Sequence, residues 1–423
     1  MLKFGVSLIR WMGPCFITLG LSPALLGAEQ ERSLLSLHTA VVLAVDHYPD
    51  LAAKRFDLKA SGYELAAAKW QLLPSLRYSY EDVNGGINQG VTTLQQPIFT
   101  FGKLRNKVAI ATAGFGQAQH DFSELRLQLA LKVSVEFFSV VSEVERLKIS
   151  AESVMAHRRL YEMITRRVEA EASADADRTL ARARLDAALS EKMQIEQNLH
   201  LANLRLASLV GAPFDGVAFP LKDSSWRVRE AQVIEAALAV APSLAILEAQ
   251  KRSAKAKEYL AEGEMYPDIH LKFEDRKGDT NFFNPETQRI FVEFSFDTGA
   301  GLSKKASLNA ARERVFASEQ RILGERQRLE GEVAALYQNH KAAVARAPVL
   351  DSLVAATDAV VSSYIRQYTV GRKSWLDVMN AQREWAASKH QRVENLISMN
   401  LHMIHLEMRS GGFFDEPTVT DIK

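Results

Sequence analysis

The sequence predicts a mainly helical protein with a small β part, built from two internal repeats. Related motifs recur about 200 residues apart, such as LPSL at 73–76 and YPDI at 266–269, which are offset by 193 residues. The 90 residues of 121–210 contain neither glycine nor proline and are rich in strong helix formers. Short segments that alternate apolar and polar residues precede each long helical stretch. The same order of motifs in both halves indicates one structural unit present twice.

Residues 1–28 have the features of a secretory signal peptide. Lys3 and Arg10 give a basic start, an apolar run covers 11–26, and small residues follow before Glu29. An N-terminal membrane anchor is the alternative, but the run is shorter than the ~20 apolar residues of a spanning helix. The only cysteine of the chain lies inside this segment, so the mature chain is expected to form no disulfide.

The first repeat is expected to cover 29–220. It consists of a helix, a β-hairpin at about 75–99, a long helix, a turn at about 169–174 and a returning helix. The turn is placed where large apolar residues disappear from an otherwise continuous helical pattern. The uninterrupted stretch has to fold back, because a straight rod of that length is far longer than an average globular helix.

The second repeat is expected to cover 221–412, followed by a C-terminal tail at 413–423. Its hairpin lies at about 268–297 and its helical turn at about 369–374. Gly371 in this turn can adopt a left-handed conformation without a steric penalty. The second long helix contains Pro348, which we expect to kink or interrupt it.

Four segments alternate apolar and polar residues as strands with two different faces do. They are 76–81, 269–274, 289–296 and, more weakly, 91–99. In these segments the charges fall on one face and the rings on the other. This arrangement suits a sheet in a membrane, with one face toward a water-filled interior and the other toward lipid. The charges in question are those of Lys272, Glu274 and Glu293.

Two hairpins give four strands per chain, too few to close a barrel. An open sheet edge inside lipid leaves backbone groups without partners at several kcal/mol each. Strands placed in a membrane must therefore pair with strands of other chains. The alternative is a soluble four-stranded sheet that caps a helical bundle.

Several motifs together resemble the TolC-like outer-membrane factor family. They are the two proline-containing joints quoted above, QPIFTFG at 96–102, LASLVGAP at 206–213 and YTVGRKSWLDVMNAQR at 368–383. The resemblance implies a homotrimer with a twelve-stranded barrel in the outer membrane of a Gram-negative bacterium. A long α-helical coiled-coil tunnel would continue the barrel across the periplasm, where most of the mass would lie. The tunnel would meet a periplasmic adaptor protein and an inner-membrane pump.

Within the family, VEFSFDTGAGLS at 292–303 looks like the members that serve type I secretion of large adhesins. That resemblance implies an ATP-binding-cassette transporter as the inner-membrane partner. The outer-membrane channel of a multidrug efflux pump of the RND type is the alternative within the family. A soluble periplasmic coiled-coil scaffold or adaptor is the alternative from another class.

The resemblance also implies a gate at the turn between the long and the returning helices. By motif match, Asp177 in the first repeat and Tyr368, Lys373, Asp377 and Asn380 in the second fall there. We expect Asp177 to accept hydrogen bonds from Tyr368 and Lys373 and so to latch the helical pairs. Many relatives have arginine in place of Lys373, and some have a second aspartate in place of Asn380. A turn that contacts only water or the adaptor is the alternative.

Nothing in the sequence indicates an enzyme, a cofactor or a nucleic-acid partner. The net charge of +1 gives no electrostatic footprint for nucleic acid. No serine, histidine and aspartate occur in a recognisable catalytic signature. His402 and His405 are spaced to share a metal on a helix, but packing or surface roles are more common for such a pair.

Overall fold

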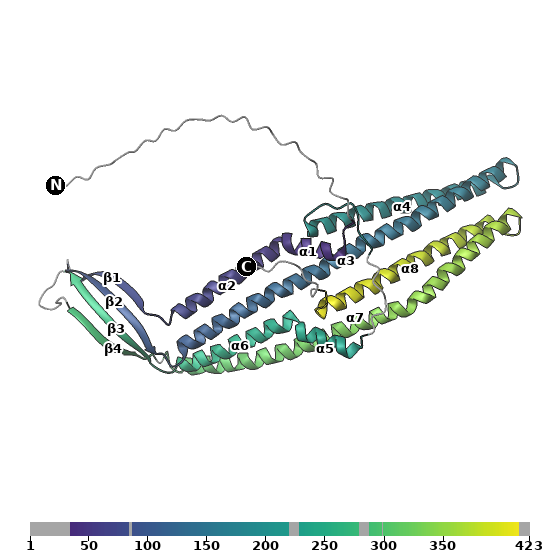
Figure 1. Ribbon diagram of the computed structural model, residues 1–423. Coiled ribbons are helices and arrows are strands. Elements are labelled where there is room, and N and C mark those ends of the chain that lie inside the picture. Colours follow the sequence, from purple (N-terminus) through teal and green to yellow (C-terminus); the bar gives the residue numbers. More distant parts are fainter. Residues whose placement is uncertain (1–33, 84–86, 220–227, 279–286, 298, 414–423) are drawn as a thin grey trace, which may run out of the picture. The chain divides into compact units, whose positions relative to one another are not determined.

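The computed structural model describes residues 34–83, 87–219, 228–278, 287–297 and 299–413 (Figure 1). The predicted signal peptide at 1–28 lies outside the described residues, as does nearly all of the predicted tail at 413–423.

Both halves of the chain follow the order helix, helix, strand, strand, helix, helix. The elements of the first half are α1 (Leu37–His47), α2 (Pro49–Trp70), β1 (Ser75–Val83), β2 (Ile87–Phe99), α3 (Lys103–Glu169) and α4 (Asp175–Val210). Those of the second half are α5 (Glu230–Val240), α6 (Pro242–Gly263), β3 (Asp268–Gly278), β4 (Thr287–Ser295), α7 (Ser303–Thr369) and α8 (Trp375–Arg409). The predicted mainly helical fold with a small β part is confirmed.

The helix starts follow from local chemistry. Pro49 and Pro242 open α2 and α6 directly after residues in extended conformation. Proline suits the first helical position because it has no N–H to leave unpaired and its φ is already helical. Helix α4 ends at Gly211, whose φ of 74° is left-handed, as is common for the residue that follows a helix.

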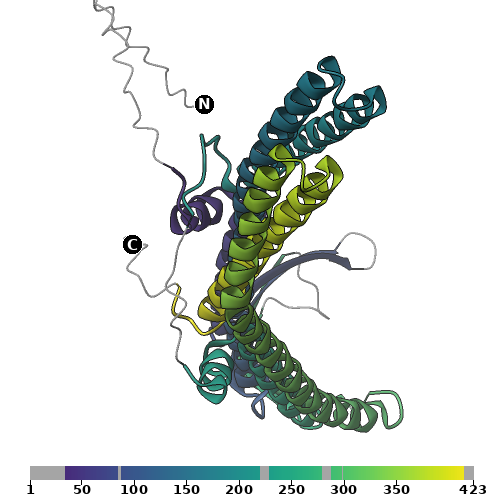
Figure 2. The same ribbon diagram turned by 90° about the vertical axis from the view of Figure 1, so that its right-hand side faces the viewer.

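The two long helices, of 67 residues each, organise the packing. Helix α3 contacts α1, α2, α4, α6 and α8, whereas α7 contacts α5, α6 and α8. The hairpin α3–α4 therefore lies beside the hairpin α7–α8 through α3 and α8 (Figure 2). The largest apolar core surrounds the middle of α3, where Phe137 and Phe138 are fully buried between residues of α1, α4 and α8.

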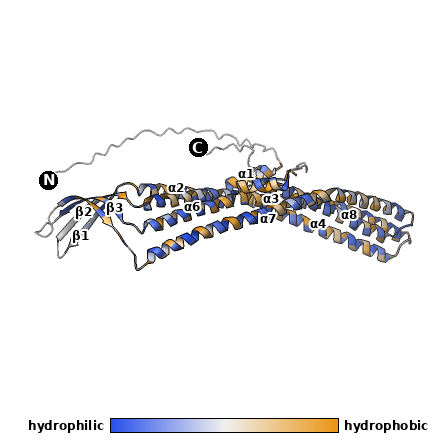
Figure 3. Cartoon of the chain, turned by 90° about the horizontal axis from the view of Figure 1, so that it is seen from below, coloured by the Kyte–Doolittle hydropathy of each residue, from blue (hydrophilic) through white to orange (hydrophobic). Residues whose placement is uncertain are grey.

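Apolar and polar residues are mixed along the helices (Figure 3). Among the described residues, no single helix has the length and apolar composition that a membrane span needs. Helices α5 and α6, which meet at an angle of 45°, pass that test only as a pair.

Of the kink or interruption that we expected at Pro348, the interruption does not occur. Helix α7 continues through it from Ser303 to Thr369. The Pro348 side chain is exposed, so the carbonyl oxygen of Val344, four residues earlier, can bond to water in place of the missing N–H. The contacts of α7 with α6 and α8 hold the helix on either side of this position.

The four strands form one antiparallel sheet in the order β1-β2-β3-β4. The register is regular except for a bulge in β2 between Pro97 and Phe99. Strands β1 and β4 are therefore the two edges of the sheet. Strand β2 leads into α3 and β4 leads into α7, so the sheet is attached to the starts of both long helices (Figure 1).

Candidate functional site

The turns that join α3 to α4 and α7 to α8 have the same backbone hydrogen bonds. The amide of Ala172 donates to the carbonyl of Arg167 at 2.7 Å, and that of Arg372 donates to the carbonyl of Gln367 at 2.9 Å. Both bonds close the loop typical of a helix that ends in a left-handed residue. That residue is Glu171 in the first turn, with φ of 55°, and Gly371 in the second, with φ of 75°.

An apolar cluster connects the two turns, and we call it the tip cluster. Its buried residues come from all four helices that end or begin there: Leu160, Ile164, Ala181, Tyr368, Trp375, Val378 and Met379. Burying aromatic and aliphatic side chains between the hairpins supplies most of the attraction between them at this end.

Asp177 makes a polar contact between the hairpins in this region, but with a partner that we did not expect. The indole Nε1 of Trp375 donates a hydrogen bond to Asp177 Oδ1 at 3.0 Å. Trp375 is only 7% exposed, so this bond lies at the edge of the tip cluster. A partly shielded hydrogen bond to a charged group contributes about 1.5–3 kcal/mol.

The expected hydrogen bond from Tyr368 to Asp177 is not formed within the chain. The Tyr368 ring is 4% exposed, and its hydroxyl has no hydrogen-bond partner among the described residues. The guanidinium of Arg167 lies 4.9 Å from the centroid of this ring and donates to the Tyr368 carbonyl at 3.4 Å. The Tyr368 ring is thus held inside the tip cluster, while the indole of Trp375 is hydrogen-bonded to Asp177.

Lys373 does not bind Asp177 in the chain either. Its Nζ lies 4.5 Å from the centroid of the Tyr364 ring, so the ammonium stays on its own hairpin as a cation–π contact. Neither expected donor thus reaches Asp177: the Lys373 ammonium contacts Tyr364, and the Tyr368 hydroxyl is buried in the tip cluster.

Asp377 caps its own helix. Its Oδ2 accepts hydrogen bonds from the amide of Ser374 at 3.1 Å and from the Ser374 hydroxyl at 2.8 Å. In return, the amide of Asp377 donates to the Ser374 hydroxyl oxygen at 3.2 Å. The hydrogen bonds from Ser374, and secondarily the charge of Lys373, lower the pKa of Asp377. Asn380 lies one turn farther along α8 and is exposed.

Sequence reasoning missed two of these contributions. Arg167 was not singled out, although a long cation in the last turn of a helix commonly reaches toward nearby carbonyls. Trp375 was not among the expected donors to Asp177 either. Its ring packs in the tip cluster, and its indole N–H provides a polar contact between the hairpins.

The seam between α3 and α8 carries two further polar contacts away from the tip. Lys389 donates to Glu152 at 2.5 Å, and Ser134 and His405 are hydrogen-bonded at 2.9 Å. Burial, and then the charge of Arg409, lower the pKa of His405 to about 4. The described residues contain no group of three or more histidine, cysteine, aspartate or glutamate side chains placed to hold a metal ion.

One face of the sheet is polar, and we call it the polar face. Residues paired across the strands share a face, and one such row contains Arg77, Thr93, Glu274 and Arg289. Glu274 accepts from Arg289 at 2.6 and 2.9 Å. Lys272 and Glu293 form an ion pair on the same face. Phe291 is the ring on this side, and the guanidinium of Arg289 lies 4.8 Å from its centroid.

The opposite face, which we call the apolar face, is exposed in the single chain. One row of paired residues there contains Leu76, Leu94, Phe273 and Ile290. Leu76 and Ile290, at the two edges, are 73% and 72% exposed. An exposed apolar area of this kind on an ordered sheet marks a surface that a partner or a membrane covers.

A family model described as "Outer membrane efflux protein" matches residues 40–212 and 233–407. These two segments cover most of both halves of the chain. No curated protein sequence matches this chain.

Several solved structures share the fold. The outer membrane protein VceC of Vibrio cholerae has a TM-score of 0.78 at 17% identity, over 89% of this chain and 96% of that one. The CmeC outer membrane channel of Campylobacter jejuni has a TM-score of 0.77 at 15% identity, over 89% and 85%. The open state of the MtrE outer membrane channel of Neisseria gonorrhoeae has a TM-score of 0.71 at 16% identity, over 91% of each chain.

Proposed function

The chain belongs to the outer membrane efflux protein family, and from this premise we propose that it is the outer-membrane channel of a tripartite export system. Three copies would each contribute four strands to one barrel in the outer membrane. The long helices would continue the barrel as a tunnel through the periplasm, where an adaptor protein and an inner-membrane pump complete the path. The chain itself performs no bond chemistry in this proposal.

The observation that carries the proposal is the sheet with two free edges and one exposed apolar face. Within the described part of the chain, β1 and β4 each pair on one side only. In lipid, each unpaired backbone group costs several kcal/mol, so the edges require strands from other copies. The apolar face then meets lipid, and the polar face, with Arg77, Glu274 and Arg289, lines the water-filled interior.

The two halves are proposed to be repeats of one unit. Their elements occur in the same order, and α3 and α7 have equal lengths, as do α2 and α6. Two similar halves per copy would place six similar units around the tunnel. Each unit would add one hairpin of strands to the barrel and one hairpin of helices to the tunnel wall.

The two helical turns form the proposed gate of the tunnel. The tip cluster and the bond from Trp375 to Asp177 hold the hairpins of one copy together at this end. Opening separates the hairpins, so it must break these contacts. Lys373, Asp377 and Asn380 lie next to the turn, on the surface that remains available to neighbouring copies or to the adaptor.

The more specific proposal is type I secretion of a large protein such as an adhesin, with an ATP-binding-cassette transporter. It rests on the segment 292–303, which covers the last residues of β4 and the entry to α7. The alternative is an RND-type multidrug efflux system. Deleting the gene separates the two: loss of surface adhesin and biofilm with unchanged drug susceptibility supports secretion, and the reverse result supports efflux.

Cross-linking of the strand edges tests the channel proposal. The chain has one cysteine, in the predicted signal peptide, so introduced cysteines report cleanly. Ser79→Cys in β1 is combined in turn with Thr287→Cys, Arg289→Cys or Phe291→Cys in β4. Mild oxidation of outer-membrane fractions should give a dimer and trimer ladder for one of these pairs, because only one register brings the cysteines together.

Two results bear on the interpretation of the cross-link. Ser79→Cys alone is the matched control and should give no ladder, since identical edges do not pair in a ring built head to tail. A monomer recovered from periplasmic extract, without a cross-link for any pair, would contradict the proposal.

A further inference from the structure

The two edge strands of the sheet carry charges on the polar face. Arg77 lies on β1, and Arg289 and Glu293 lie on β4. Arg77 is exposed and forms no ion pair with any residue that the structure describes. On the proposed function, on which this inference rests, β1 of one copy pairs with β4 of the next. The Arg77 guanidinium is therefore available to a carboxylate of the neighbouring copy.

Pairing between β1 and β4 of the next copy can adopt only a few registers. The strands of the sheet alternate in direction, so these two edges meet antiparallel. A slip of one residue would turn the polar residues of one strand toward lipid and its apolar residues toward water. The possible registers therefore differ in steps of two residues.

One of these registers places opposite charges face to face. When Arg77 lies opposite Glu293 of the next copy, the same register places Glu81 opposite Arg289. One step in either direction leaves both charged residues of β1 opposite uncharged residues. Two steps in one direction place Arg77 opposite Arg289, where like charges repel.

The same register extends ion pairs that exist within one chain. Glu293 is paired with Lys272, and Arg289 is hydrogen-bonded to Glu274. The next copy adds the cation of Arg77 beside Glu293 and a carboxylate beside Arg289. Charges then alternate in sign across the junction between copies, and such networks contribute more than isolated exposed pairs.

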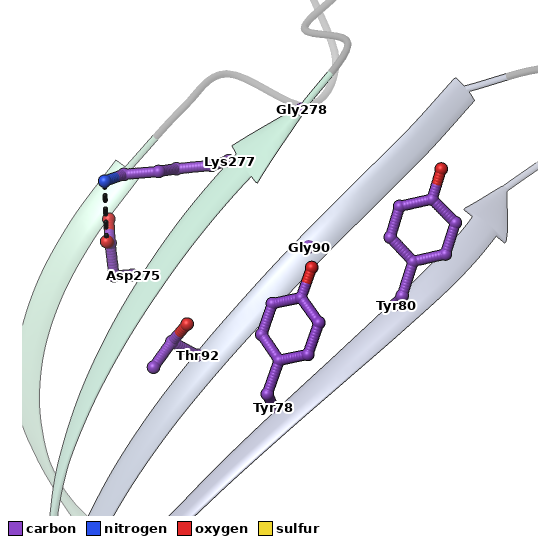
Figure 4. Close-up of a pocket in the computed structure, with 7 residues that line it drawn as sticks. All are labelled: Tyr78, Tyr80, Gly90, Thr92, Asp275, Lys277 and Gly278. Atoms are coloured by element: carbon purple, nitrogen blue, oxygen red, sulfur yellow. Dashed lines mark ion pairs between the residues drawn. The ribbon is translucent and has the colours of Figure 1, made fainter. Parts of the chain in front are cut away.

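The apolar face fits in this register as well. Figure 4 shows the rings of Tyr78 and Tyr80, which come from β1, and both are exposed in the single chain. Val292 and Ile290 of the next copy, which are exposed too, come to lie opposite them. An aromatic ring opposite a branched aliphatic side chain is a favourable cross-strand pair. One step in register would instead place Gln288 opposite Tyr80.

The inclination of the strands gives an independent check. The row that begins at Arg77 ends at Arg289 and continues, in this register, to Glu81 of the next copy, four residues beyond Arg77. With about 3.3 Å per residue and about 4.8 Å between strands, this shift over four strands inclines them by about 35°. Barrel strands are typically inclined by about 35–45°. The register that opposes the two arginines gives no inclination, and a shift of six residues gives about 46°. The charges thus select four residues over six.

We propose that two ion pairs between neighbouring copies, Arg77 with Glu293 and Glu81 with Arg289, fix the register in which the barrel closes. The partner is a second copy of this chain, and each copy contributes one residue to each pair. The charges lie on the polar face, where water fills the interior, so they specify the junction without placing a charge in lipid.

Disulfide cross-linking of the full chain in outer-membrane fractions tests the register. Ser79→Cys is combined with Phe291→Cys, and Ser75→Cys with Ser295→Cys, because each pair lies face to face in the proposed register. Both pairs should give dimer and trimer ladders on mild oxidation. Exchanging the partners is the matched control. Ser75→Cys with Phe291→Cys and Ser79→Cys with Ser295→Cys use the same cysteines and should give no ladder.

A charge reversal tests whether the ion pairs select this register. Arg77→Glu places a carboxylate opposite Glu293 and should lower the yield of the cross-link between Ser79→Cys and Phe291→Cys by roughly fivefold. Adding Glu293→Gln removes the repulsion and should restore most of the yield. Glu274→Gln, on the same face but away from the junction, is the control and should not restore it. Circular dichroism checks that each variant keeps the helical content of wild type.

The outcomes separate this inference from the proposed function. A ladder for the exchanged pairs, or only for Ser79→Cys with a cysteine at Thr287, Arg289 or Glu293, would overturn the register and leave the channel standing. A yield that Arg77→Glu does not change would overturn the role of the ion pairs. A monomer without a cross-link for any pair would refute the channel itself.

Discussion

The turns at 170–174 and 370–374 share a backbone but use their side chains differently. Helix α8 begins with a complete capping box, in which Ser374 and Asp377 bond each other's amides. Helix α4 begins after Ala174, which provides no side-chain cap. Asp177, at the position 200 residues before Asp377, reaches across to Trp375 instead of back to its own helix.

This difference indicates that the first turn of α4 depends on a contact with the other hairpin, whereas the first turn of α8 does not. Helix α8 satisfies its first amides from its own residues, whereas the first turn of α4 is held from the other hairpin by Trp375. When the hairpins separate, α4 loses that contact and α8 keeps its cap. We therefore expect the start of α4 to loosen first, and the predictions below test this asymmetry.

The largest effect is expected for Trp375→Ala. Truncating a buried aromatic residue costs about 3–5 kcal/mol, and the bond to Asp177 is lost with it. Amide hydrogen exchange over 170–182 should become faster and the conductance in planar bilayers should rise. Asp175→Ala, at the position 200 residues earlier, is the control. It removes only an exposed ion pair with Arg178 and should change the stability by less than about 0.5 kcal/mol.

Trp375→Phe separates the packing of the indole from its hydrogen bond. It keeps most of the ring, removes the hydrogen bond to the Asp177 carboxylate and should cost about 1.5–3 kcal/mol. An equal effect of Trp375→Ala and Asp175→Ala would show that the two turns are equivalent.

The second effect is a pH dependence of stability that is expected to be largest around His405, in the second half. The pKa of His405 is lowered to about 4 because burial disfavours its charged form. The unfolded chain, with a pKa near 6.5, takes up the proton first. Stability is thus complete above about pH 6.5 and declines as the pH falls toward 4, by roughly 2 kcal/mol after allowance for partial exposure. The measurement is the melting temperature between neutral pH and about pH 5.

His405→Gln should abolish most of this dependence while keeping a side chain that can bond Ser134. The residue 200 positions earlier is Arg205, which forms an exposed pair with Glu136 in place of a buried histidine. Hydrogen exchange of the first hairpin near Arg205 should respond less to acid than that of α8 near His405. A His405→Gln variant with the acid sensitivity of wild type would locate the titrating group elsewhere.

The third prediction concerns the left-handed residues of the two turns, where substitution should change the stability in opposite directions. Glu171 holds a left-handed φ of 55° that costs a residue with a side chain about 1–2 kcal/mol, whereas Gly371 holds φ of 75° without that cost. Glu171→Gly should stabilise the first turn by about 1 kcal/mol, and Gly371→Ala should destabilise the second by a similar amount. Local hydrogen exchange measures both changes. If both substitutions stabilise, or both destabilise, their turns, side-chain contacts rather than backbone conformation would determine the change in stability.

The smallest effect is expected from exchanging the caps. Ser374→Ala should cost about 1 kcal/mol, and Ala174→Ser should gain at most as much. If the start of α4 depends on its neighbour, Ala174→Ser should also reduce its sensitivity to Trp375→Phe. A double-mutant cycle of these two substitutions gives the coupling directly, and additive effects would contradict the dependence.

Local patterns predicted much of the fold. The alternation in 76–81 and 289–296 predicted strands with two faces, and the register places Leu76 and Ile290 in one row. The alternation is local because neighbouring side chains of a strand point to opposite faces wherever the strand lies. Pro348 departs from local prediction in one respect, since the local rule allowed an interruption and the helix instead continues through it, with α6 and α8 packed against it.

The sequence by itself determined the helices, the strands and their faces, because these follow from residue types within a few positions of each other. Only the tertiary structure decided which donor reaches Asp177. Tyr368, Lys373 and Trp375 are all within a few residues of the turn, and each could donate. The choice depends on how two separate hairpins pack. The Tyr368 ring packs in the tip cluster, and the Lys373 ammonium lies over the Tyr364 ring. The indole of Trp375 is the donor that lies within reach of Asp177.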